Sequence, residues 1–135
     1  MGLTRKFYLK LAAALLLLFN SCGALYGGWL LIADPTGSKL QMPLTVLQYS
    51  PFTNFLIPGV VLFFANGVFG ILTLGLIGFN AKYYPMAIIA QGAILTGWIV
   101  IQMFMLHTIN PLQITMGITG ISLLLLGYLL IPKSN

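Results

Sequence analysis

The sequence predicts an all-α protein: a four-transmembrane-helix bundle with a short interfacial or re-entrant helix in the first outer loop. The chain is 59% hydrophobic and 5% charged, whereas a soluble domain is about a quarter charged. Four apolar runs reach the roughly 20 residues that a helix needs to cross a bilayer. None of them alternates in polarity as a transmembrane strand would. We therefore expect residues 1–135 to form a single integral membrane domain.

The first span is expected at residues 7–32. Arg5, Lys6 and Lys10 precede its apolar core, and this arrangement resembles a secretory signal sequence. A mature secreted chain should turn polar after the cleavage site, but this sequence stays apolar beyond Cys22. We therefore expect the segment to be retained as a span.

The connection at residues 33–54 is the only long one. Apolar and polar residues are interspersed in it, with Pro43 placed to begin a short helix and Pro51 placed to end one. This pattern predicts a short helix at the outer interface, with a re-entrant segment as the alternative. The loop either acts as a lid over the helix ends or carries a functional site, as long loops often do.

The second span is expected at residues 55–79, with Pro58 accommodated near its first turn. It overlaps the run SPFTNFLIPG at residues 50–59, and DPTG at residues 34–37 lies upstream. These segments resemble a family of small bacterial four-helix integral membrane proteins of unassigned function. The resemblance covers residues 27–70 and carries over no functional residue.

The third and fourth spans are expected at residues 85–106 and 112–131. Asn80-Ala81-Lys82 forms the turn before the third span. Pro111 is well placed in the first turn of the fourth helix, and Pro132 stops it.

The basic residues predict the orientation of the chain. Four spans place Lys39 and Asp34 on one side of the membrane. The other basic residues fall on the opposite side and are Arg5, Lys6, Lys10, Lys82 and Lys133. The positive-inside rule therefore predicts a multi-pass protein of the plasma (inner) membrane with both termini in the cytoplasm.

Small residues recur in every predicted helix and predict close packing, because helices in lipid associate through small residues. Gly23 and Gly27 have GxxxG spacing, and Ala93 and Gly97 share that spacing. We expect a compact bundle. The same strips can equally contact a protein partner or a second copy of the chain.

The predicted spans hold no ionisable residue at mid-depth, so amides are their notable polar groups. Gln91 and Gln102 are close to three helical turns apart and share a face. We expect a polar seam, which is either an interhelical hydrogen-bond network or a contact for a ligand, a lipid headgroup or a conducted molecule. The seam candidates are Asn20, Asn66, Gln91 and Gln102.

Asp34 and His107 form a candidate outer-face site. Asp34 is expected to accept turn hydrogen bonds from Thr36 and Gly37, with a bound cation or pairing with Lys39 as alternatives. His107 is expected to cap a helix C-terminus or to titrate near neutral pH. One His without Cys or Glu neighbours cannot form a metal site, so we expect neither metal nor cofactor.

These features favour a non-enzymatic membrane protein that acts as an accessory subunit, scaffold or lipid-binding module. Its expected partners are membrane lipid and either a protein partner or a second copy through the glycine-rich faces. The alternative is an oligomeric pore or small-molecule channel with an amide-lined seam. A net charge of +5 without a clustered basic footprint argues against nucleic acid.

Overall fold

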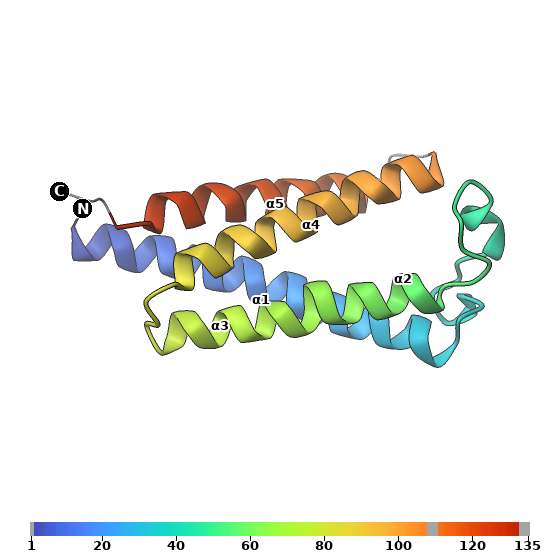
Figure 1. Ribbon diagram of the computed structural model, residues 1–135, viewed down its shortest axis with the longest axis horizontal. Coiled ribbons are helices and arrows are strands. Elements are labelled where there is room, and N and C mark those ends of the chain that lie inside the picture. The colour runs from blue at the N-terminus through green and yellow to red at the C-terminus, as the bar shows by residue number, and fades with distance from the viewer. Residues whose placement is uncertain (1, 108–110, 133–135) are drawn as a thin grey trace.

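The computed structural model describes residues 2–107 and 111–132, which form antiparallel helical rods (Figure 1). The second rod is continuous but changes its helix type along its length. The second rod consists of α2 (Leu56–Val61), the π-helix η3 (Leu62–Val68) and α3 (Phe69–Gly78). The other rods are α1 (Leu3–Ala33), α4 (Tyr84–Leu106) and α5 (Pro111–Leu130).

The prediction of an all-helical protein with four membrane-compatible helices is confirmed for the described residues. The helices long and apolar enough to span a membrane are Leu3–Ala33, Leu56–Gly78, Tyr84–Met105 and Pro111–Leu130. The last three lie close to the predicted spans. The first begins earlier than predicted, because Arg5 and Lys6 are good helix formers and continue the helix beyond its apolar run.

The two ends of the bundle are formed by different segments of the chain (Figure 1). At the terminal end, α1 begins, α5 ends, and a turn joins α3 to α4. At the loop end, the long connection joins α1 to α2. Asp34 and Lys39 belong to the connection at the loop end. At the terminal end, Arg5, Lys6 and Lys10 belong to the first turns of α1, and Lys82 belongs to the turn between α3 and α4. Lys133 lies outside the described residues.

Glycines bring α1 against the second rod. A Cβ atom added to Gly28 would lie 2.8 Å from the backbone nitrogen of Phe63. Along the same interface Leu31 contacts Gly59, and Leu25 contacts Gly67. The second rod therefore has more residues between Gly59 and Gly67 than α1 has between the contacting residues Leu31 and Leu25. This stretch of the second rod includes the π-helix η3, whose i→i+5 bonds place more residues in each turn.

Glycines also join α4 to α5, but they are not the pair that the GxxxG spacing suggested. A Cβ added to Gly92 would lie 2.8 Å from the backbone oxygen of Gly120. By contrast, no neighbouring atom lies within 4 Å of the Cβ position of Gly97, and Ala93 is exposed. The Cβ position of Gly23 also has no neighbouring atom within 4 Å, and Gly27 makes only an ordinary van der Waals contact with the Leu62 side chain. Spacing defines a helix face but not the direction in which that face points.

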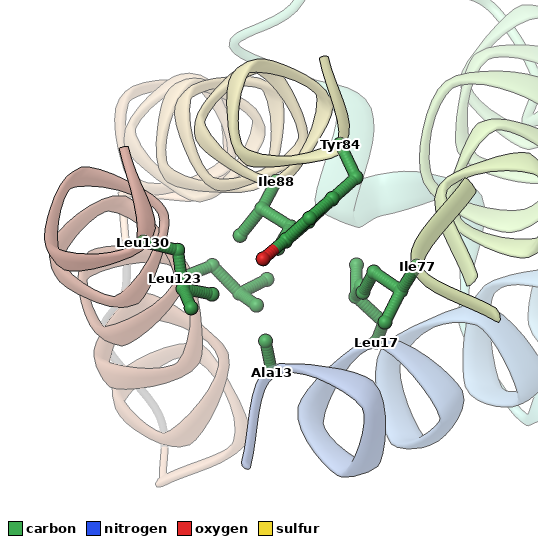
Figure 2. Packing of buried hydrophobic residues seen from close by; sticks show 7 residues of the cluster. All are labelled: Ala13, Leu17, Ile77, Tyr84, Ile88, Leu123 and Leu130. Carbon is green, nitrogen blue, oxygen red and sulfur yellow. The ribbon is translucent and has the colours of Figure 1, made fainter. Parts of the chain in front are cut away.

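Apolar side chains from all four rods converge in one core cluster (Figure 2). This cluster joins the α1–α3 side of the bundle to the α4–α5 side. Its buried members are Ala13, Leu17, Ile77, Tyr84, Ile88, Leu123 and Leu130.

The long loop contains two short 3₁₀ helices, η1 (Ser38–Leu40) and η2 (Leu44–Leu47), where we predicted one short helix. Gln41 interrupts the helical backbone with a left-handed φ of 56°. Pro43 precedes η2, as expected. The loop packs onto the end of α1 through a second buried cluster of Leu31, Leu47 and Phe55.

Candidate functional site

Four polar side chains are almost completely buried in the bundle, and we refer to them together as the central polar cluster: Asn20, Ser21, Asn66 and Gln91. Each side chain is at most 1% exposed. α1 contributes Asn20 and Ser21, η3 contributes Asn66, and α4 contributes Gln91. Three of the four predicted seam residues therefore lie in the buried interior, on three different rods.

The amides of Asn66 and Gln91 link the two sides of the bundle. The Gln91 Nε2 atom donates a hydrogen bond of 3.1 Å to Asn66 Oδ1. Gly70 of α3 provides the space beside this pair. A Cβ atom there would overlap Ser21 Oγ and would lie 3.3 Å from Gln91 Oε1. A glycine therefore lets Ser21 and Gln91 approach the same point on α3.

The cluster keeps hydrogen-bonding capacity beyond the Asn66–Gln91 bond. Among the described residues, no hydrogen-bond partner is found for Asn20 Nδ2, Ser21 Oγ, Asn66 Nδ2 or Gln91 Oε1. These atoms include amide donors, an amide acceptor and a hydroxyl. Amides and hydroxyls do not ionise near neutral pH. The cluster can therefore form hydrogen bonds, but it supplies no acid or base for catalysis.

Gln102 lies outside the central polar cluster. It is half-buried on α4, and the separation from Gln91 corresponds to about 16 Å along a helix. A shared helix face did not bring these two side chains to the same depth. Conversely, Ser21 was absent from the predicted seam. Its signal in the sequence is its spacing from Leu17 and Ala24, which puts it on the buried face of α1.

At the loop end, Asp34 stabilises a tight turn. Its Oδ1 accepts a 2.6 Å hydrogen bond from the Thr36 hydroxyl, and its Oδ2 accepts one of 2.5 Å from the Ser38 hydroxyl. These bonds lower the pKa of Asp34, with Ser38 as the larger cause and a smaller electrostatic effect from Lys39. Thr36 is a donor as expected, but the Gly37 N–H donates to the backbone oxygen of Asp34 and not to its carboxylate.

His107 ends α4 and packs on the long loop. Its backbone N–H donates to the Met103 oxygen at 3.1 Å, and its φ of 55° is left-handed. Its ring stacks on Tyr49, with centroids 3.9 Å apart and planes 7° from parallel. Within the described residues, no interaction joins His107 to Asp34, and no group of three His, Cys, Asp or Glu residues could hold a metal. The structure therefore does not unite the two residues of the candidate outer-face site.

Comparison with known proteins found no matching family model, no matching curated protein and no matching solved structure. The resemblance to small bacterial four-helix membrane proteins stays a prediction. The chain's own residues are therefore the basis for a functional proposal.

Proposed function

We propose that this chain is a non-enzymatic membrane protein that acts by binding another membrane protein, as an accessory subunit or scaffold. The observation that carries the proposal is the outward face of α4 formed by Ala93 and Gly97. Ala93 is exposed, and the Cβ position of Gly97 has no neighbouring atom within 4 Å. Small residues at this spacing allow another helix to approach closely in lipid.

The internal packing of α4 does not account for this face. Its close contact with α5 uses Gly92, which points about 100° away from Ala93 around the helix. The helix therefore has one smooth face inside the bundle and another outside it. The outer one is suited to a helix from a partner protein.

The position of the amides favours binding over a pore. Asn20, Asn66 and Gln91 point into the interior of a single chain and are at most 1% exposed. An amide-lined oligomeric pore would need such groups on a surface shared between chains. Catalysis is also poorly supported, because Asp34 and His107 are engaged in separate local contacts.

The proposed test is purification of tagged protein in a mild detergent, followed by mass spectrometry of stoichiometric partners. We expect wild type to retain a partner, and Ala93→Leu/Gly97→Leu to lose it. Gly75→Leu is the matched control, because Gly75 is also open on its helix. The proposal is wrong if wild type carries no stoichiometric partner, or if Gly75→Leu loses the partner equally.

We also propose that the terminal end lies in the cytoplasm and that the chain belongs to the plasma membrane. The proposal is supported by the described basic residues, of which only Lys39 lies at the loop end. In a Cys22→Ser background, an impermeant maleimide added to intact cells should label Ser38→Cys but not Lys82→Cys. Labelling of Lys82→Cys but not of Ser38→Cys would show that the chain has the opposite orientation and would contradict the proposal.

A further inference from the structure

An open cavity of about 460 Å³ lies at the terminal end, between the first turns of α1 and the end of α3. Two kinds of side chain line it. Lys6, Lys10 and Asn80 provide polar groups, and Phe7, Leu11 and Ile77 provide an apolar wall. The volume lies within the roughly 300–1,000 Å³ of typical small-molecule sites. The lining suits a ligand with one charged part and one apolar part.

Local structure fixes the polar part of this cavity. Asn80 follows α3 with a left-handed φ of 53°, and the Ala81 N–H bonds the Leu76 oxygen at 2.9 Å. This Schellman-type helix end turns Asn80 toward α1. The Lys10 Nζ atom donates a 3.0 Å hydrogen bond to Asn80 Oδ1 and lies 4.8 Å from the centre of the Tyr84 ring. Lys6 is one turn earlier on the same side of α1.

The lysines in this cavity have no acidic side chain to pair with. Asp34 is the only acidic residue of the chain, and it lies at the loop end, where it binds Thr36 and Ser38. The neutral amide of Asn80 positions Lys10 but does not balance its charge. Two ammonium groups in one cavity therefore favour an anion from outside the chain.

We infer that this cavity binds an anionic phospholipid. The phosphate would accept hydrogen bonds from Lys6 and Lys10, while the start of an acyl chain would pack on Phe7, Leu11 and Ile77. Basic pockets between membrane helices are suited to such headgroups. The apolar wall favours a lipid over a free phosphate ion. The inference goes beyond the proposed function, because the cavity is formed by α1 and α3 and the proposed protein contact by α4.

The test is titration of purified protein in an uncharged detergent with phosphatidylglycerol or phosphatidylcholine, with bound lipid counted by native mass spectrometry. We expect phosphatidylglycerol to bind more tightly, and inorganic phosphate not to displace it. Lys6→Gln/Lys10→Gln should weaken binding about 30-fold, at roughly 1 kcal/mol for each lysine. Leu11→Gln should weaken it several-fold while leaving the charge unchanged.

The matched control is Arg5→Gln/Lys82→Gln, which removes the same charge from the same end but leaves the cavity lining intact. It should bind phosphatidylglycerol nearly as well as wild type. Each variant is first shown to be monodisperse and helical, so that a loss of lipid binding does not reflect unfolding. Equal losses in the two double variants, equal binding of the two lipids, or displacement by inorganic phosphate would each overturn the inference.

Discussion

The bundle consists of two helix pairs, α1 with the second rod and α4 with α5. The contacts within each pair differ in kind from the contacts between the pairs. Within the pairs, backbones approach closely at glycines, as at Gly28 against Phe63 and Gly92 against Gly120. Between the pairs, side chains fill the space, through the apolar cluster around Leu123 and the Asn66–Gln91 hydrogen bond. Each pair is therefore sensitive to added volume, whereas the junction between pairs is sensitive to removed atoms.

The largest expected effect comes from adding volume within a pair. Gly92→Leu should lower the free energy of unfolding by about 3 kcal/mol, near the upper end for overpacking, because backbone atoms of α5 lie 2.8 Å from the new Cβ. The measurement is unfolding by SDS titration in mixed micelles. Gly97→Leu, on the open face of α4, is the control and should change stability little. Similar losses in both variants would contradict the distinction between the two faces.

Removing atoms from the junction should have the next largest effect. Leu123→Ala should cost about 2–3 kcal/mol, because Leu123 is fully buried and its truncation leaves a cavity. The same SDS titration measures it. Leu125→Ala is the comparison, since Leu125 is 58% exposed on the same helix. A loss as large for Leu125 would mean that the cluster does not hold the pairs together.

The amide bond between the pairs should contribute less. A double-mutant cycle with Asn66→Ala and Gln91→Ala should give a coupling energy of about 0.6 kcal/mol, the average for hydrogen bonds between membrane helices. Replacing Gln91→Ala by Gln102→Ala in the cycle should abolish the coupling, because Gln102 lies about 16 Å further along α4. Coupling in both cycles would indicate an indirect effect of Asn66 on packing.

The smallest effect on stability is expected at Asp34, which lies outside the helix pairs and outside the junction between them. Hydrogen bonds from the Ser38 and Thr36 hydroxyls hold the pKa of Asp34 below its ordinary value. The turn is therefore fully stabilised above that ordinary value and loses this stabilisation as pH falls through the lower folded pKa. Carbon NMR of the carboxyl group should give a titration midpoint below that of an ordinary aspartate in wild type. In Thr36→Ala/Ser38→Ala the midpoint should rise. An unchanged midpoint would show that these hydroxyls do not set the pKa.

The rods were predictable from sequence because their length and hydropathy are local properties. Pro58, Pro111 and the Asn80 turn lie near the helix limits for reasons visible in the sequence. The π-helix η3 was not predictable in this way. Its run Leu62–Val68 contains no proline and no capping side chain that would distinguish it from the α-helical segments on either side.

The candidate site was predictable only in part. Asn66 and Gln91 were both candidates for a polar seam, with an interhelical hydrogen-bond network as one of the two interpretations, and the structure shows a hydrogen bond between them. The stacking of His107 on Tyr49 had no signal in the sequence, because it depends on how the long loop folds back. The cavity at Lys6 and Lys10 was also missed. The charge of these lysines predicts only the orientation of the chain, because the cavity forms where the end of α3 packs beside α1.

The unequal lengths of α1 and α5 have a consequence for bilayer thickness. α1 has 31 residues and α5 has 20, which correspond to about 46 Å and about 30 Å of helix. A hydrocarbon core of about 30 Å would match α5 and would leave the charged first turns of α1 among the headgroups. In a thicker bilayer, α5 becomes too short before any other rod does. Hydrophobic mismatch would therefore be concentrated along one side of the bundle, where lipid must thin locally to meet α5.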